Sequence, residues 1–344
     1  MKSLRQVWAA AQHPQIAKQS KQRVWEQTPK AFAIQTLFME EYPMIICDTH
    51  CDTLYMRAFW PQQSPCVTMD NLRRGGVSLQ TCTLWAGPKG VDDHPYDKAI
   101  AEYRAFERLR ENEGWTRVDS PLEAADGETK ILLSIEGGEV FEGKPSRVRE
   151  FHDLGVRMAA LIWNNENEIA SPAKGGSKEH IKPAGWDILR EMASLSMAAD
   201  TSHLNEQGFW DLIDRHTQPP MASHSCAKAL CDHFRNLTDE QIRAMAKRGG
   251  WIGVNFYPAF LTGTERASVR DIADHIDHMC QLGAEKCVGF GSDFDGIECT
   301  PSDCQSPADV PNILAELRRR GYSEEAVEDI AGRNFLRYFQ RLGD

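Results

Sequence analysis

Acidic and imidazole side chains stand directly after several of the short apolar runs in this sequence. Asp48, His50 and Asp52 follow the apolar residues 44–47. Side chains at positions i and i+2 of an extended segment point to the same side, so His50 and Asp52 can bind one cation together. The segment alone also fits a turn in which an aspartate side chain bonds to the backbone, without any metal.

The same placement recurs further along the chain. The residues of these types that end or closely follow other apolar runs include Glu136, His203, His224 and Asp293. Histidines and carboxylates without cysteine ligands suit Zn²⁺ or a similar divalent ion, and a shared carboxylate suggests two ions about 3.5–4 Å apart. Two such ions lower the pKa of bound water towards about 7 and polarise a carbonyl, which is the chemistry of amide and ester hydrolysis.

Eight short apolar runs alternate with amphipathic helical patterns. The expected strands are residues 44–47, 77–85, 130–135, 157–163, 195–200, 220–223, 250–256 and 286–290. The expected helices are residues 97–113, 146–154, 184–194, 205–216, 238–247, 268–282, 309–320 and 323–342. Strands that are apolar on both faces predict an α/β fold, a (β/α)8 TIM-type barrel, with a doubly wound open sheet as the alternative. The carboxyl ends of barrel strands meet at one rim, so we expect the candidate ligands to converge there.

Two parts of the chain are expected, residues 1–42 as an N-terminal helical extension and residues 43–344 as the barrel. The 344 residues include 39 basic and 50 acidic side chains, a net charge of −11, which argues against nucleic acid and membranes as partners. No apolar run approaches the roughly 18 residues of a membrane span, and no secretory signal is visible, so a cytoplasmic location is expected. In that compartment the ten cysteines are predicted to be buried thiols rather than disulfides.

The other histidines do not share the placement of the candidate ligands. His275 and His278 lie about one helical turn apart among aspartates, which predicts a solvated helix face. His233 follows the sixth apolar run and is a further candidate for the lining of a pocket.

Seven motifs in order resemble one known family. They are Asp-x-His-x-Asp at 48–52, Glu-Gly-Gly at 136–138, Asp-Thr-Ser-His at 200–203, Ser-His-Ser at 223–225, Arg-Asn at 235–236, Val-Asn-Phe-Tyr at 254–257 and Gly-Ser-Asp-Phe-Asp-Gly at 291–296. The chain is similar to the membrane (renal) dipeptidase family of zinc metallopeptidases, and particularly to its soluble bacterial members. The resemblance covers roughly residues 45–342.

The resemblance implies a barrel of the metal-dependent hydrolase type, which is often a homodimer, and a role for each site residue. His50 and Asp52 would bind one Zn²⁺, His203 and His224 would bind a second, and Glu136 would bridge the two ions together with the attacking hydroxide. Glu136 and Asp293 are thus the catalytic candidates. The substrate would be an unblocked dipeptide, and the residues that would contact it are Arg235 at its carboxylate, Asp293 at its ammonium group, Trp163 and Tyr257. A planar guanidinium suits the first task because it binds a carboxylate through two parallel hydrogen bonds.

Trp163 departs from the family pattern, because the mammalian motif has a histidine that contacts the substrate at this position. An indole donates one hydrogen bond but cannot be cationic, so transition-state stabilisation would depend more on the metal ions. Two alternatives stay open. The same site could hydrolyse another small amide, lactam or lactone, or the chain could be a non-catalytic metal-binding homologue. Asp48 is predicted to support the site rather than to bind metal.

Overall fold

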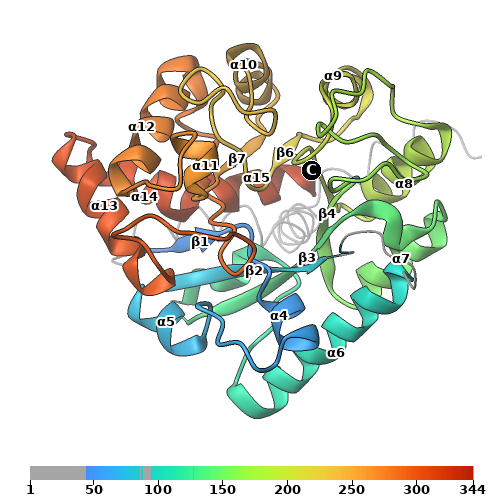
Figure 1. Ribbon diagram of the computed structural model, residues 1–344, viewed down its shortest axis with the longest axis horizontal. Helices are drawn as coiled ribbons and strands as arrows, with labels where there is room; N and C mark the ends of the chain where they lie inside the picture. The colour runs from blue at the N-terminus through green and yellow to red at the C-terminus, as the bar shows by residue number, and fades with distance from the viewer. Residues whose placement is uncertain (1–43, 86, 88–93, 127, 344) are drawn as a thin grey trace, which may run out of the picture. The chain divides into compact units, whose positions relative to one another are not determined.

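A computed structural model of the chain describes residues 44–85, 87, 94–126 and 128–343. The strands in this part of the chain are β1 (Ile46–Asp48), β2 (Val77–Trp85), β3 (Lys130–Glu136), β4 (Val156–Ala160), β5 (Ala198–Asp200), β6 (Met221–Ala222), β7 (Trp251–Val254) and β8 (Val288–Phe290). Each strand is parallel to the next, and β8 pairs with β1, so the sheet closes into a barrel (Figure 1). The predicted (β/α)8 barrel is therefore confirmed, and the open-sheet alternative is wrong.

Several strands are shorter than the apolar runs that predicted them. The run 195–200 pairs only from Ala198, because its first residues complete the turn before the strand: Leu195 N–H bonds to Glu191 O at 3.2 Å, and Ser196 has φ +54°. The run 250–256 pairs only as far as Val254, since the following residues turn into the rim of the barrel. Apolar composition thus marks burial, whereas the length of a strand depends on its partners.

The helices of the described residues include one or more at each predicted helical range. They are α4 (Thr53–Phe59), α5 (Met69–Arg74), α6 (Pro95–Glu113), α7 (Pro145–Asp153), α8 (Pro183–Ser194), α9 (Glu206–Arg215), α10 (Asp239–Lys247), α11 (Pro258–Leu261), α12 (Val269–Met279), α13 (Val310–Arg319), α14 (Glu324–Glu328) and α15 (Asn334–Leu342). The short helices α4, α5 and α11 were not predicted. The expected helix 323–342 is divided by a wider turn at Asp329–Arg333. At the start of α10, Thr238 and Gln241 form the reciprocal hydrogen bonds of a capping box.

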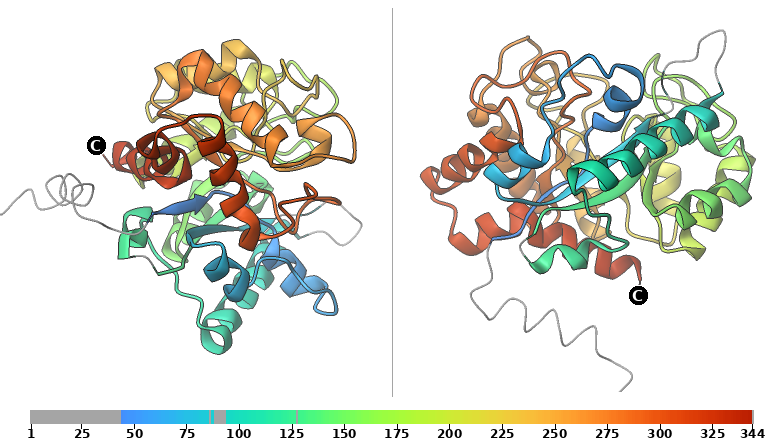
Figure 2. Two further views of the ribbon diagram at one scale, coloured as in Figure 1. Left: turned by 90° about the vertical axis from the view of Figure 1, so that its left-hand side faces the viewer. Right: turned by 90° about the horizontal axis from the view of Figure 1, so that it is seen from below.

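The last helix lies across the amino ends of two barrel strands. In α15 the Tyr338 hydroxyl donates to Pro219 O at 3.2 Å, and the Arg341 guanidinium donates to Gly249 O at 2.9 Å. Pro219 lies just before β6, and Gly249 lies just before β7. Figure 2 shows the C-terminal helices, in red, against the strands. The helix α15 therefore covers the amino ends of β6 and β7, on the side opposite to the rim where the strands end.

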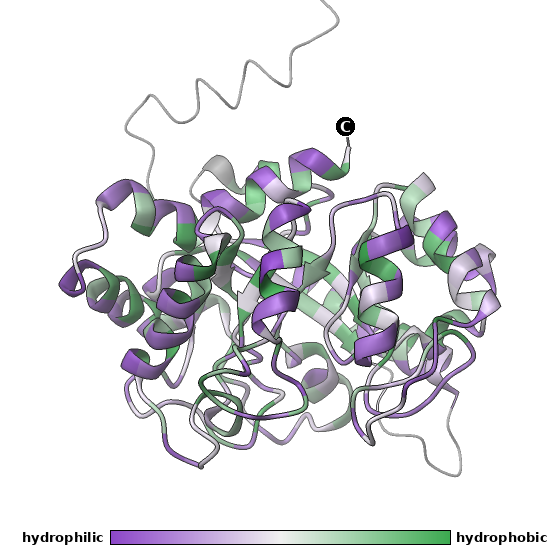
Figure 3. Ribbon diagram, turned by 90° about the horizontal axis from the view of Figure 1, so that it is seen from above, coloured by the Kyte–Doolittle hydropathy of each residue, from purple (hydrophilic) through white to green (hydrophobic). Residues whose placement is uncertain are grey.

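The core consists of the strands and the inward faces of the helices. In Figure 3 the outward faces of the helices are largely hydrophilic. All ten cysteines are free thiols, as predicted. Seven of them are buried, including Cys47, Cys82 and Cys287, whereas Cys66, Cys280 and Cys299 are half-buried, so the predicted burial is wrong for these three. Among the described residues, no helix combines the length and the apolar character needed to cross a membrane. The predicted helical extension 1–42 lies outside the described residues and stays a prediction.

Candidate metal centre

The carboxyl ends of five strands bring six predicted site residues together at one rim. His50 and Asp52 follow β1, Glu136 ends β3, His203 follows β5, His224 follows β6 and Asp293 follows β8. Five of them are buried, and Asp293 is partly exposed. Groups of three donor atoms from this set lie within 4.8 Å of one another, which is the spacing of a metal site.

The Glu136 carboxylate is divided between two sets of donors. Its Oε1 lies 2.8 Å from Nε2 of His203 and 3.3 Å from Nε2 of His224. Its Oε2 lies on the side of His50, 3.8 Å from Nε2, and that nitrogen is in turn 3.6 Å from Oδ2 of Asp52. One carboxylate can therefore serve two neighbouring cation positions.

Hydrogen bonds to Nδ1 fix which nitrogen each histidine presents. Nδ1 of His203 lies 3.1 Å from Oδ1 of Asn164. An amide oxygen only accepts, so Nδ1 carries the hydrogen and Nε2 keeps its lone pair. Nδ1 of His50 similarly lies 3.3 Å from the Thr83 hydroxyl. Such outer hydrogen bonds orient imidazoles that bind metals.

His224 is oriented by a chain of two further residues. The Ser223 hydroxyl donates to the Asp200 carboxylate, and it lies 2.7 Å from Nδ1 of His224. Because the serine hydrogen is used by Asp200, the serine oxygen accepts from Nδ1–H. All three histidines thus turn Nε2 towards Glu136.

The buried charges perturb one another strongly. Burial lowers the pKa of His50, but the attraction of nearby carboxylates, Glu136 first, outweighs it and raises this pKa to about 10. Burial raises the pKa of Asp293 to about 7, against the attraction of His50. Burial also holds the pKa values of His203 and His224 well below the usual range. These two histidines are therefore neutral at pH 7, which is the form of imidazole that binds a metal.

Strained backbone concentrates at the rim. Five described residues other than glycine have positive φ, and three of them, His203, Asp293 and Asp295, belong to this site at +65° to +66°. Backbone strain of this kind persists where the surrounding structure fixes it, often at functional sites. Gly296 adds a close approach, because a Cβ there would lie 2.0 Å from Oδ2 of Asp52 and 2.7 Å from Oδ1 of Asp293.

A cavity of about 360 Å³ opens onto this rim. Trp163 and Tyr257, both predicted to contact a substrate, line it together with Asp52, Glu136, His203 and Asp293. Arg235 is not among the described lining residues. It is buried next to the site, where its guanidinium donates to His224 O at 3.3 Å and its Nε has no hydrogen-bond partner among the described residues.

Two other predictions concern residues around the ligands. Asp48 is buried and accepts hydrogen bonds from the backbone and side chain of Ser292, at 2.8 and 2.5 Å, which agrees with its predicted supporting role. His233 is half-buried and packs on Phe260 with ring centroids 4.5 Å apart, but it is not among the described residues lining the cavity.

Sequence reasoning missed the aromatic residues that share the cavity, notably Tyr55, Trp60 and Trp85. Trp85 ends β2, and Tyr55 follows Asp52 by three residues, so position after a strand was a usable signal. Glu102 offered none, because acidic residues are ordinary in a helix such as α6. It is nevertheless fully buried, and its carboxylate accepts from Trp85 N–H at 2.8 Å.

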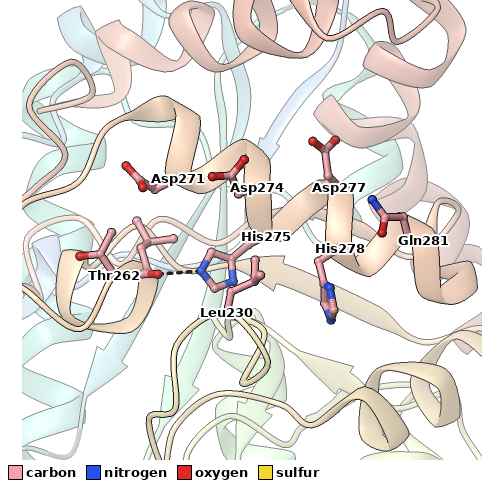
Figure 4. Close-up of a pocket in the computed structure, with 9 residues that line it drawn as sticks. Leu230, Thr262, Asp271, Asp274, His275, Asp277, His278 and Gln281 are labelled. Carbon is pink, nitrogen blue, oxygen red and sulfur yellow. Dashed lines mark hydrogen bonds between the residues drawn. The ribbon is translucent and has the colours of Figure 1, made fainter.

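A larger cavity of about 520 Å³ lies elsewhere, along α12 (Figure 4). His275 lines it but is buried, so the prediction of a solvated helix face is wrong for this residue. Its Nδ1 accepts from Ala227 N–H at 2.9 Å, and its Nε2 donates to Leu261 O at 3.0 Å. Both ring nitrogens are occupied, which makes His275 a link between loops. His278 is half-buried and bonds to Asp239 at 2.8 Å.

Several known proteins similar to this chain are named as dipeptidases. The uncharacterized dipeptidase C3A11.10c of Schizosaccharomyces pombe is 37% identical over 217 residues, which cover 62% of this chain and 53% of that protein. Dipeptidase aclJ of Aspergillus oryzae is 34% identical over 222 residues, 63% of this chain and 52% of the relative. The match thus spans about half the length of each relative.

The fold also matches a solved structure, a metallo peptidase from Rhodobacter sphaeroides liganded with a phosphinate mimic of the dipeptide L-Ala-D-Ala. The TM-score is 0.80 at 22% identity, over 87% of this chain and 99% of that one. The family model for membrane dipeptidases, peptidase family M19, matches residues 36–343. With the barrel and its rim of histidines and carboxylates, that match shows that this chain belongs to the membrane dipeptidase family.

Proposed function

We propose that this chain is a zinc-dependent dipeptidase that hydrolyses the peptide bond of unblocked dipeptides. The observation that carries the proposal is the division of the Glu136 carboxylate between His203 and His224 on one side and His50 on the other. A bridging carboxylate between histidine donors suits two divalent ions. The names of the relatives and family membership support the same activity.

The donor atoms at the rim fit a metal. Nε2 of His50 and Oδ1 of Asp52 are buried without a hydrogen-bond partner among the described residues. Buried polar atoms left in this way are costly unless a cation or another partner satisfies them. His50 and Asp52 would hold one Zn²⁺, His203 and His224 a second, and Glu136 would lie between them. When bound, the two ions would supply an ionised water and polarise the scissile carbonyl.

Asp293 would bind the ammonium group of the dipeptide. Asn255 donates to its Oδ2 at 2.8 Å, while its Oδ1 faces the centre, 3.7 Å from Nε2 of His50. A carboxylate oriented in this way can accept from the substrate amine beside the metal ligands. Its pKa of about 7 also suits it to take up and return a proton near neutral pH.

Arg235 would bind the carboxylate of the dipeptide. Its guanidinium is buried, and one nitrogen lacks a partner among the described residues, so a substrate carboxylate would compensate a costly charge. Recognition of both chain ends would explain selection of dipeptides over longer peptides. Trp163 and Tyr257 would contact the substrate between these ends, from the wall of the cavity.

A second candidate, hydrolysis of another small amide, lactam or lactone, is kept because of Trp163. An indole at this position cannot supply a cationic contact to the carbonyl oxygen, so the preferred substrate can differ from that of relatives with histidine. The non-catalytic alternative is disfavoured, since the whole predicted donor set is present at the rim.

The test combines metal analysis with kinetics. Purified protein is expected to bind close to two Zn²⁺ per chain and to release amino acids from L,L- or L,D-dipeptides when loaded with zinc, cobalt or manganese. N-acetylated and C-amidated versions of the best dipeptide are expected to react much more slowly, because each removes one recognised charge. Equal turnover of blocked and free dipeptides would contradict the proposal, and turnover of lactams or lactones alone would favour the second candidate. A cytoplasmic location and a homodimer stay predictions from the sequence.

A further inference from the structure

Six aromatic residues line the cavity above the candidate metal centre, namely Tyr55, Trp60, Trp85, Trp163, Tyr257 and Phe260. Four of them form a continuous surface, here called the aromatic wall: Tyr55, Trp60, Trp85 and Trp163. Trp85 meets Trp163 edge to face at 4.9 Å between ring centroids and meets Tyr55 at 4.6 Å. Tyr55 meets Trp60 at 5.0 Å. Such edge-to-face pairs stabilise a defined arrangement of rings.

Two carboxylates outside the wall fix its position. Glu102 accepts from the backbone N–H of Trp85 at 2.8 Å. Asp295 accepts from the N–H groups of Cys66 at 2.7 Å and Val67 at 3.2 Å, as well as from the Thr53 hydroxyl. The bonds to Asp295 tie Thr53 and residues 66–67, at the two ends of the segment that carries Trp60, to the loop after β8. The wall is thus held before any substrate arrives, which lowers the entropic cost of binding.

The charge of the cavity has one sign. Its described lining residues include five carboxylates, Asp52, Glu136, Asp293, Asp295 and Glu298, and neither lysine nor arginine. Asp52 and Glu136 would be balanced by metal ions and Asp293 by the substrate amine, whereas Glu298 remains exposed at the edge beside Tyr257. An anionic side chain entering this space would meet like charge without a cationic partner.

The Tyr55 end of the aromatic wall lies on the side of the cavity that would receive the first residue of a dipeptide. Trp163, at the other end of the wall, lies beside His203 with ring centroids 6.2 Å apart. The carboxylate of Asp293, the proposed ammonium site, lies close to that of Asp52. A Cβ built at Gly296 would lie 2.7 Å from the first and 2.0 Å from the second. Tyr55 stands in α4 three residues after Asp52. Arg235, the proposed carboxylate site, lies instead near Phe260, with its Cζ 5.7 Å from the ring centroid.

We infer that the aromatic wall selects dipeptides with a large apolar or aromatic N-terminal side chain and that the cavity rejects acidic ones. The inference rests on the dipeptidase function proposed above and names its substrate class. Burial of a side chain as large as Phe or Leu against rings predicts a kcat/KM about 10- to 100-fold higher for Phe-Gly and Leu-Gly than for Ala-Gly. Asp-Gly and Glu-Gly are expected to fall below Ala-Gly.

The experiment measures kcat/KM for an X-Gly series and for the reversed Gly-X series with the zinc-loaded protein. Two neighbouring substitutions separate the wall from general effects on α4. Trp60→Ala removes a lining ring and is expected to lower kcat/KM for Phe-Gly about tenfold, with little change for Ala-Gly. Phe59→Ala removes a ring of similar exposure that packs on Tyr55 at 5.0 Å but is not among the described lining residues, so it is expected to lower kcat/KM for Phe-Gly less than Trp60→Ala does.

Binding without turnover separates this inference from the proposed function. Calorimetry on metal-free protein is expected to show tighter binding of Phe-Gly than of Glu-Gly. That result without turnover of any dipeptide by the zinc-loaded protein would support the wall and contradict the peptidase activity. Equal kcat/KM for Phe-Gly, Ala-Gly and Glu-Gly, a preference confined to the Gly-X series, or the same loss in Trp60→Ala and Phe59→Ala would overturn the inference.

Discussion

Oε1 of Glu136 lies 2.8 Å from Nε2 of His203, although the two residues come from different strands of the barrel. The other oxygen of the same carboxylate is on the side of His50. A single side chain at the end of β3 therefore joins the donors that follow β1 with those that follow β5 and β6. The arrangement depends on the hydrogen bonds that orient each imidazole and on the absence of a side chain at Gly296, and each of these can be tested separately.

Ser223→Ala removes the hydroxyl between Asp200 and Nδ1 of His224. Without this acceptor the imidazole loses its orientation, and zinc affinity is expected to fall about 10- to 100-fold. Competition with a chelator measures the change. Ser225→Ala is the matched control, because the Ser225 hydroxyl is also buried next to His224 in sequence but has no hydrogen-bond partner among the described residues. Equal zinc affinity of the two variants would show that the Asp200–Ser223–His224 chain does not orient a ligand.

Metal binding is expected to strengthen with pH. In the metal-free protein the pKa of His50 is raised to about 10, so at pH 7 this imidazole is protonated and the metal must displace the proton. Between pH 7 and 9 His50 stays mostly protonated, but each unit lowers the proton concentration tenfold, so zinc affinity is expected to increase about tenfold per pH unit. Chelator competition at three pH values gives the affinities, and titration in weak buffer detects the released proton. An affinity independent of pH would place His50 outside the ligand set.

Gly296→Ala is expected to damage the site without unfolding the protein. The new Cβ would lie 2.0 Å from Oδ2 of Asp52. The carboxylate can move away, so the fold is expected to tolerate the substitution, but this movement displaces a proposed metal ligand. Misplacement of a reacting group by about 1 Å costs about a hundredfold in rate, so kcat/KM is expected to fall by that order while the melting temperature stays nearly constant.

Gly185→Ala gives the opposite pattern. Gly185 belongs to the helix α8, and its Cβ would lie 2.4 Å from the backbone oxygen of Ile169, which cannot move as easily as the end of a side chain. This variant is expected to melt at a lower temperature with unchanged zinc content per folded chain. A melting temperature lowered equally by both substitutions would contradict the functional role of Gly296.

Arg235→Lys keeps the positive charge but loses the planar pair of donors. Hydrogen bonds to charged groups contribute about 1.5–3 kcal/mol, so KM for a free dipeptide is expected to rise about 10- to 100-fold with kcat little changed. A C-amidated dipeptide serves as the control substrate, because it lacks the carboxylate and should react poorly with both proteins. If the substitution raised KM equally for both substrates, Arg235 would not be the carboxylate site.

The sequence by itself determined the barrel and the identity of the residues at its rim. Eight short runs that are apolar on both faces alternate with amphipathic helices, and this pattern leaves few folds other than a parallel barrel. Because the strands are parallel, any residue after a run must lie at the same rim. His50, Glu136 and His224 could therefore be grouped from their positions alone, and the family motifs agree with that grouping.

Only the tertiary structure decided how these residues are oriented and what surrounds them. His275 stands among aspartates, so helical periodicity predicted exposure, yet it is buried, and the backbone of Ala227, 48 residues earlier, donates to its ring. Trp60 lies on a segment held by Asp295, from the other end of the chain. Periodicity reports the face of one element, whereas contacts between distant loops depend on strand register and side-chain packing. The ring contacts that join the aromatic wall are products of such packing. The division of the Glu136 carboxylate was implied by the family motifs, but hydrophobic periodicity alone does not predict it.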